Sequence, residues 1–167
     1  KKMKKYVITG GAGFIGSHIA EYLSAEGHQI IVLDSLRTGF KKNLDDLNVQ
    51  FEKGDIRDKN LVEELVQGAN GIFHLAALVS VPESLLNIKE CIDINTLGTI
   101  NILEAAKKNH GCKVVLSSSA ANYGDNPILP KIETMTPEPM TPYAVTKLDG
   151  EFYLKMYQDQ WGLPTAS

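Results

Sequence analysis

The chain has 167 residues, of which 43% are hydrophobic and 22% charged, and its formal net charge is −3. This composition is typical of one globular domain with a substantial core, and the negative charge removes the electrostatic reason to expect nucleic acid as a partner. No apolar run approaches the ~20 residues that cross a bilayer, and the basic N-terminus is not followed by the apolar stretch of a signal peptide, so we expect no membrane partner.

Short apolar runs alternate with longer stretches of helical period. We expect strands at residues 6–9, 29–34, 49–52, 71–75 and 113–117, and helices at 14–26, 61–66 and 85–109. Residues 30–33 read Ile-Ile-Val-Leu without polar alternation, as a strand buried on both faces requires. In helix 14–26, the residues Ile15, Ile19, Tyr22 and Leu23 form one apolar stripe. The alternation predicts a parallel sheet covered by helices.

Two later segments break this alternation. Residues 120–141 contain four prolines and no convincing helix or strand, and a connection of this length without structure is usually functional. Thr141 as N-cap and Pro142 in the first turn predict the start of the next helix. Residues 162–167 indicate a turn into a sixth strand, where the chain stops. We therefore expect a doubly wound α/β sheet of Rossmann type.

The turn after the first strand is rich in glycine, with Gly10, Gly13 and Gly16 between that strand and the first helix. The first glycine permits a tight turn, the second lets backbone approach a diphosphate, and the third lets helix pack close to strand. The helix N-terminus then offers N–H groups and a partial positive charge to phosphates. A plain tight turn is the alternative, but the strand–turn–helix context favours dinucleotide binding.

Acidic residues follow the second and third strands. Asp34 lies 18 residues beyond Gly16, where a carboxylate accepts hydrogen bonds from the adenosine ribose and repels a 2′-phosphate. This favours NAD over NADP, although Arg37 is close enough to attract that phosphate and a solvated loop carboxylate is the alternative for Asp34. Asp55 is positioned either to meet the adenine or to cap the helix around Leu61.

Tyr143 and Lys147 are four residues apart at the start of a helix and so share one face. A phenol is a poor base at neutral pH unless a nearby positive charge favours its phenolate, which an ammonium and the helix N-terminus both provide. An exposed helix pair is the alternative. Ser117, Ser118 and Ser119 end the fifth strand at the same sheet edge as the glycine turn and supply hydroxyls there.

Five segments together resemble the extended short-chain dehydrogenase/reductase (NAD-dependent epimerase/dehydratase) family, most of all the UDP-hexose 4-epimerases. They read GGAGFIG (10–16), HLAA (74–77), NTLGT (95–99), SSSAANYG (117–124) and YAVTK (143–147). The resemblance spans nearly the whole chain. Members of the family are about twice this long, so the resemblance implies that residues 1–167 are an NAD-binding domain that carries the catalytic residues, cut off before a C-terminal substrate region.

The resemblance also implies roles for individual residues. Tyr143 would be the catalytic base, Lys147 its electrostatic partner and Ser119 a hydrogen-bond partner of the sugar 4-hydroxyl, while Ser80 and Tyr143 would also contact substrate. The implied NAD contacts, beyond Tyr143 and Lys147, are Gly10, Gly13, Phe14, Ile15, Gly16, Asp34, Asp55, Ile56, Leu75, Ala76, Ala77, Asn95 and Ser117. Asn122 departs from the family, which usually carries an apolar residue there.

The implied activity is 4-epimerisation of UDP-glucose/galactose or a UDP-N-acetylhexosamine through a transient 4-keto sugar, in a homodimer packed through helices 85–109 and 142–160. Dehydratases of the family carry an Asp-Glu pair in the serine run, where this chain has Ser118-Ser119, which disfavours dehydration. Two alternative functions remain: a decarboxylase or reductase of the same family, and a non-catalytic NAD-binding module.

The remaining candidates have simple interpretations. Cys91 and Cys112 form no CxxC pair and no cluster with histidine, so we expect no metal site. Free thiols suit a reducing cytosol, and we expect a cytoplasmic protein in which both are small core residues. His74 lies in the fourth strand and is the one histidine considered as a catalytic candidate.

Overall fold

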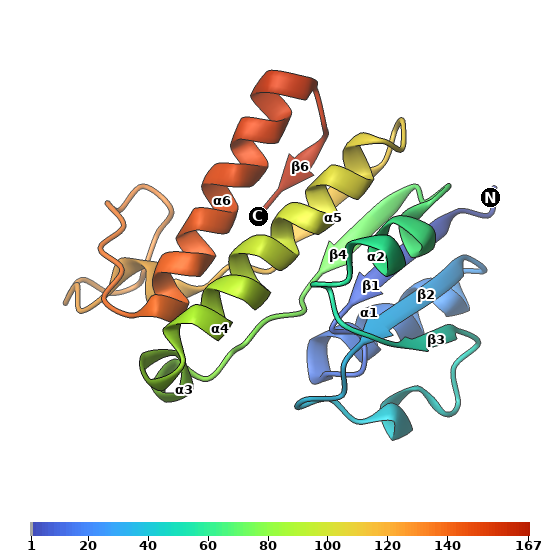
Figure 1. Ribbon diagram of the computed structural model, residues 1–167, viewed down its shortest axis with the longest axis horizontal. Coiled ribbons are helices and arrows are strands. Elements are labelled where there is room, and N and C mark those ends of the chain that lie inside the picture. The colour runs from blue at the N-terminus through green and yellow to red at the C-terminus, as the bar shows by residue number, and fades with distance from the viewer. Residues whose placement is uncertain (1) are drawn as a thin grey trace.

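The computed structural model describes residues 2–167. Six strands within them form one parallel sheet in the order β3-β2-β1-β4-β5-β6 (Figure 1). The strands are β1 (Lys5–Thr9), β2 (Gln29–Asp34), β3 (Gln50–Lys53), β4 (Gly71–His74), β5 (Lys113–Leu116) and β6 (Thr165–Ala166). The chain builds outward from β1 to β3, then returns to the other side of β1 and builds outward to β6. The predicted doubly wound sheet and its sixth strand are confirmed.

Six α-helices connect these strands. They are α1 (Phe14–Ala25), α2 (Lys59–Val66), α3 (Val81–Leu86), α4 (Ile88–Ile92), α5 (Gly98–Lys107) and α6 (Pro142–Trp161). Short 3₁₀ turns lie at Lys41–Leu44 and Ala120–Tyr123. Figure 1 shows α2, α5 and α6 in front of the sheet and α1 behind it. None of the helices in residues 2–167 is long and apolar enough to cross a membrane.

Both faces of the sheet are buried because side chains of a strand alternate between them. In β1, Val7 packs into the core under α2, α5 and α6, while its neighbour Ile8 packs into the core beside α1. In β2, Leu33 belongs to the first core and Val32 to the second, and both are at most 1% exposed. This two-sided burial explains the unbroken apolar run of β2.

The single helix expected at residues 85–109 is wrong. The helical stretch begins earlier, at Val81, because Ser80 Oγ caps it by accepting a hydrogen bond from the amide of Glu83 at 3.2 Å. It breaks at Asn87, whose φ of −130° and ψ of 57° are not helical, and it widens into a π turn at Asp93–Leu97. Apolar periodicity runs through all these pieces, so it does not reveal the breaks.

The expected apolar stripe of α1 is also wrong in part. Ile15 and Tyr22 are 58% and 67% exposed, and the buried residues of the helix are Gly16, Ser17 and Ala20. A Cβ placed on Gly16 would lie 2.6 Å from the Cα of Gly11, closer than any real contact. The helix therefore packs against the glycine turn through small residues, which turns its larger side chains outward.

The start and end of α6 follow the sequence prediction. Thr141 Oγ1 accepts a hydrogen bond from the amide of Ala144 at 3.2 Å, and Pro142 occupies the first turn. Gly162 ends the helix with a φ of 68°, a left-handed conformation that glycine adopts without steric cost. The long segment before α6 contains, as expected, no helix or strand beyond the 3₁₀ turn at Ala120–Tyr123.

Candidate active site

The carboxyl ends of the central strands open into a crevice of about 720 Å³, which continues to the first turn of α6. Crevices in this position, where the strand order reverses, are the usual ligand sites of open α/β sheets. Most of the residues predicted for the site line this one crevice: Gly10, Gly13, Phe14, Ile15, Gly16, Asp34, Asp55, Ile56, Leu75, Ala76, Ala77, Ser117, Tyr143 and Lys147.

The glycine turn follows β1 and lines the crevice between the carboxyl ends of β2 and β4. Gly10 has a φ of 70°, and a Cβ on it would lie 2.7 Å from the amide nitrogen of Ala76. Gly13 is the N-cap of α1 and provides no side-chain cap, so the first turn of this 12-residue helix faces the crevice with its amides uncovered by side chains. Such a cradle suits the diphosphate of a dinucleotide.

Asp34 lies at the carboxyl end of β2 and is only 7% exposed, so it is not a solvated loop carboxylate. Its Oδ2 accepts from the amide of Ala12 at 2.9 Å and its Oδ1 from the amide of Leu36 at 2.8 Å. The second bond holds Leu36 at a φ of 61°, which is uncommon for a non-glycine residue. Each carboxylate oxygen keeps a lone pair for a ligand hydroxyl.

The crevice floor is fixed by a buried chain of hydrogen bonds through His74. Thr99 Oγ1 donates to the carbonyl of Asn95 and lies 2.9 Å from His74 Nε2, so Nε2 carries the proton. His74 Nδ1 then accepts from Thr9 Oγ1 at 2.6 Å, and Thr9 Oγ1 in turn accepts from the amides of Leu75 and Ala76. His74 thus fixes the backbone that lines the crevice.

His74 is 1% exposed and does not line the crevice, so it has no direct access to a ligand. Burial, with a smaller contribution from the charge of Lys147, lowers the pKa of His74 to about 3. The imidazole is therefore neutral at ordinary pH, which suits its two hydrogen bonds to threonine hydroxyls.

The two alternatives for Asp55 are resolved in favour of the crevice. Asp58, not Asp55, caps α2, since its Oδ1 accepts from the amide of Leu61 at 3.1 Å. Asp55 lines the crevice and accepts three hydrogen bonds from the guanidinium of Arg57, the shortest at 2.6 Å. These bonds hold the pKa of Asp55 below its usual range.

Tyr143 and Lys147 both line the crevice from the first turns of α6, on the β5 side of the sheet. Lys147 Nζ donates to the carbonyl of Ser117 at 2.8 Å and lies 5.9 Å from the centre of the Tyr143 ring. Burial lowers the pKa of Lys147 to about 8, so at pH 7 the ammonium form still dominates by about ten to one. A positive charge therefore lies beside the phenol, as phenolate stabilisation requires.

The loop after β5 is held by Asn122, the residue that stands where the resembled family usually carries an apolar side chain. Asn122 is 3% exposed, and its Nδ2 donates to Ser118 Oγ at 3.2 Å and to Glu151 Oε1 at 2.9 Å. Ser118 Oγ also donates to Glu151, and Asn122 Oδ1 is buried without a partner. The polar side chain thus ties this loop to α6.

Three of the predicted residues do not line the crevice. Asn95 is buried behind its wall, where Oδ1 accepts from the amide of Leu78 at 2.7 Å and Nδ2 donates to Thr146 Oγ1 at 3.0 Å. Ser80 caps α3. Ser119 Oγ accepts from the amide of Ala121 at 3.1 Å, a bond that leaves its own O–H free to donate.

The prediction also missed several lining residues, among them Ser35, Thr38, Gly39, Arg57 and Val79. Ser35, Thr38 and Gly39 come directly after β2, so their place at the end of a parallel strand was the signal available for them. Within the described chain, no three His, Cys, Asp or Glu residues are placed to hold a metal ion.

Residues 6–167 match the model of a family described as the NAD dependent epimerase/dehydratase family. A UDP-glucose 4-epimerase of Mycolicibacterium smegmatis is 39% identical over 163 residues, which cover 94% of this chain and 52% of that protein. The chain spans about half the length of the curated relatives that it matches.

Two solved structures show the same fold at more than 30% identity. A UDP-N-acetylglucosamine 4-epimerase from Methanobrevibacter ruminantium, in complex with UDP-N-acetylmuramic acid, matches with a TM-score of 0.93 and 36% identity over 99% of this chain and 54% of its own. A UDP-glucose 4-epimerase of Thermus thermophilus in complex with NAD matches with a TM-score of 0.89 and 38% identity over 97% of this chain and 53% of its own.

Proposed function

The chain belongs to the NAD dependent epimerase/dehydratase family, and we propose that it provides the cofactor-binding and catalytic residues of an NAD-dependent nucleotide-sugar 4-epimerase. One observation supports this above all others: a single crevice is lined by Asp34 on the β2 side, by the glycine turn after the central strand β1, and by the Tyr143–Lys147 pair on the β5 side. A dinucleotide bound along it would extend from the diphosphate cradle to the phenol.

NAD is the proposed cofactor, and the chemistry of the lining residues fits it. The amides around Gly10, Gly13 and Gly16 would hold the diphosphate, Asp34 the adenosine ribose, and Asp55 with Ile56 the adenine. Bound NAD supplies a hydride acceptor that later returns the hydride, so a complete cycle leaves it unchanged.

The protein's own residues would move the proton and hold the substrate. Tyr143 would take the proton of the sugar 4-hydroxyl, and the buried ammonium of Lys147 would stabilise the phenolate that this requires. Lys147 would also bind the nicotinamide ribose. Ser119 would donate to the reacting oxygen, and Ser80, whose cap bond uses only its oxygen lone pairs, would donate to the sugar nucleotide.

The proposed substrate is a UDP-hexose or UDP-N-acetylhexosamine. The relatives named above are epimerases of UDP-glucose and UDP-N-acetylglucosamine, and they support this class of substrate without distinguishing between the two. The chemistry of the serine run supports epimerisation, since Ser118 and Ser119 provide no acid and base for the elimination of water.

The test incubates the complete protein that contains this chain with UDP-glucose and with UDP-N-acetylglucosamine, without added cofactor, and resolves the sugar epimers. We expect conversion of at least one substrate without net change in nicotinamide absorbance. A net change would favour a reductase, loss of water a dehydratase and loss of carbon dioxide from a uronic-acid substrate a decarboxylase. Unchanged sugars with both substrates would reject the epimerase proposal.

We also propose a homodimer formed through the helical segments 85–109 and 142–160, which include α4, the π turn at Asp93–Leu97 and α6. Exposed apolar residues lie there: Ile92, Leu97, Val145 and Phe152 are between 43% and 63% exposed. Light scattering of the complete protein should give twice the monomer mass, and Phe152→Asp should shift the measured mass toward that of the monomer.

The proposed location is the cytoplasm, which Cys91 and Cys112 support because both are free thiols.

A further inference from the structure

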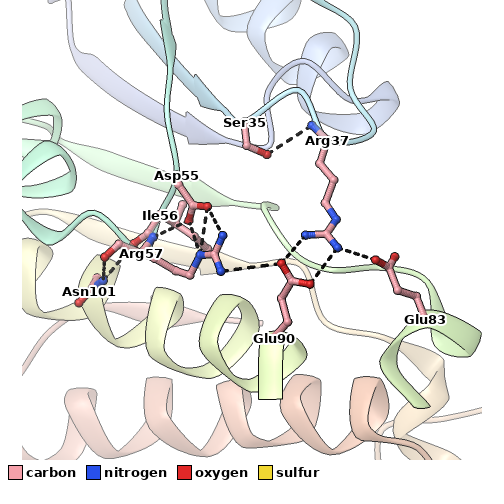
Figure 2. Close-up of polar contacts among 8 residues, drawn as sticks. All are labelled: Ser35, Arg37, Asp55, Ile56, Arg57, Glu83, Glu90 and Asn101. Carbon is pink, nitrogen blue, oxygen red and sulfur yellow. Dashed lines mark hydrogen bonds and ion pairs between the residues drawn. The ribbon is translucent and has the colours of Figure 1, made fainter. Parts of the chain in front are cut away.

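Arg37 extends from the loop after β2 to two carboxylates on the helices beyond β4 (Figure 2). Its Nη2 donates to Glu83 Oε1 at 2.5 Å and to Glu90 Oε2 at 3.2 Å, and its Nη1 donates to Glu90 Oε1 at 2.9 Å. Glu83 lies on α3 and Glu90 on α4, so these bonds join segments 46 and 53 residues apart.

This arrangement matters because Arg37 lines the crevice at the same end as Asp34. An arginine shortly after the second strand is the residue type that accommodates the 2′-phosphate of NADP. Here three of its five N–H donors are already used on Glu83 and Glu90. Only the Nε–H and one Nη1–H remain for a phosphate, which would have to compete with both carboxylates for the other three donors.

The surrounding charges add to this effect. Glu90 also lies 3.9 Å from Arg57, and Arg57 is itself held by Asp55. Together with Asp34, the cluster contains four carboxylates and two guanidinium groups, a formal charge of −2 beside the site where a 2′-phosphate would sit. The hydrogen bonds to Glu90 and Glu83 raise the pKa of Arg37 above its ordinary value, in agreement with a strong pairing.

The backbone around the cluster is held in place from both sides. On the β2 side, the amide of Leu36 donates to Asp34. On the β3 side, Figure 2 shows Asn101, whose Nδ2 donates to the carbonyls of Ile56 and Arg57 at 3.0 and 3.2 Å. Because these loops are anchored independently of Arg37, removing the two glutamates would free its side chain without removing the supports of the loop.

We propose that Glu83 and Glu90 determine the cofactor specificity of this site, because they hold Arg37 away from a 2′-phosphate and so exclude NADP. The inference rests on the proposed function, since it requires NAD in the crevice. In this role neither glutamate touches the reacting atoms. From the sequence alone, Arg37 favours binding of NADP. Once it is paired with Glu83 and Glu90, the same residue no longer favours NADP.

The test measures the dissociation constants of NADH and NADPH by fluorescence titration of the complete protein after removal of its cofactor. Glu83→Gln/Glu90→Gln should tighten NADPH binding at least about tenfold, while NADH binding changes less than about threefold. The triple variant with Arg37→Gln added should lose this gain. The matched control is Glu63→Gln/Asp159→Asn, which removes two carboxylates paired with Lys108 and Lys155 outside the crevice and should show no gain.

The outcomes separate the two proposals. Unchanged NADPH binding in a folded double variant that still binds NADH would overturn the inference and leave the proposed function standing. A gain of equal size in the control, or one that persists without Arg37, would also overturn it. A wild-type protein that binds no NADH would contradict the proposed function and this inference with it. If the double variant does not fold, Glu83→Gln alone should give a smaller gain, and its absence would overturn the inference.

Discussion

The ammonium group of Lys147 is buried against the carbonyl oxygen of Ser117, to which it donates at 2.8 Å. Only 5% of Lys147 is exposed, and its one hydrogen bond to protein replaces only part of the hydration that the charge loses. The incomplete replacement of this hydration destabilises the folded state while a positive charge is kept beside Tyr143. The size of this destabilisation depends on pH and can be measured.

Lys147→Met should remove a pH-dependent part of the stability. The folded pKa of about 8 lies below the ordinary value of 10.5, so between these pH values the unfolded state binds more protons and stability rises with pH. The rise from this one group is roughly 3 kcal/mol. Urea unfolding at pH 7 and at pH 10 should show this rise in the wild type relative to the variant.

The same variant should be at least as stable as the wild type at pH 7, because a methionine carries no charge to desolvate. Lys155→Met, which removes a surface lysine paired with Asp159, is the matched control and should leave the pH dependence unchanged. Parallel stability curves for wild type and Lys147→Met would contradict this account of the buried ammonium.

Alanine substitutions at two glycines of the turn should affect NAD binding and stability to different extents. A Cβ on Gly13 would meet only the carbonyl of Gly10 at 3.3 Å, whereas a Cβ on Gly16 would clash with backbone of both Gly10 and Gly11. Gly13→Ala should therefore weaken NAD binding at a cost in stability below about 1 kcal/mol, while Gly16→Ala should lose about 1–3 kcal/mol. Thermal unfolding and NAD titration of both variants would test this, and equal losses of stability would be the contrary result.

His74 should make the protein sensitive to acid. Its folded pKa of about 3 lies below the ordinary 6.5, so the unfolded state binds more protons in that interval and stability falls as pH is lowered. The loss attributable to this group is about 1.4 kcal/mol for each pH unit below 6.5. The stability difference between the wild type and His74→Gln, measured by urea unfolding, should shrink by that amount between pH 6 and pH 5. A constant difference would show that His74 does not titrate in this way.

Local sequence patterns predicted the elements whose causes are local. β2 matches the expected residues 29–34 because an unbroken apolar run between a turn and an aspartate indicates a buried strand. α6 begins at Pro142 because Thr141 caps it. The glycine turn was predictable because its geometry excludes side chains at Gly10 and Gly16.

Contacts between distant segments were beyond the reach of these patterns. Nothing near Arg37 in the sequence indicates that Glu83 and Glu90 bind it, and nothing near Asn95 indicates that Leu78 and Thr146 use up its hydrogen bonds. Asp55 and Asp58 lie three residues apart, and only the phase of α2 shows that the second is the cap.

The central claim is that Tyr143 acts as the base beside a bound NAD, and Tyr143→Phe tests it most directly. The variant keeps the backbone amide that donates to Ser84 Oγ, so it should fold and retain NAD. We predict that the complete protein then loses at least about a hundredfold in the epimerisation rate of UDP-sugars, while Tyr22→Phe on the exposed face of α1 changes nothing. A Tyr143→Phe variant with nearly unchanged activity would contradict the claim.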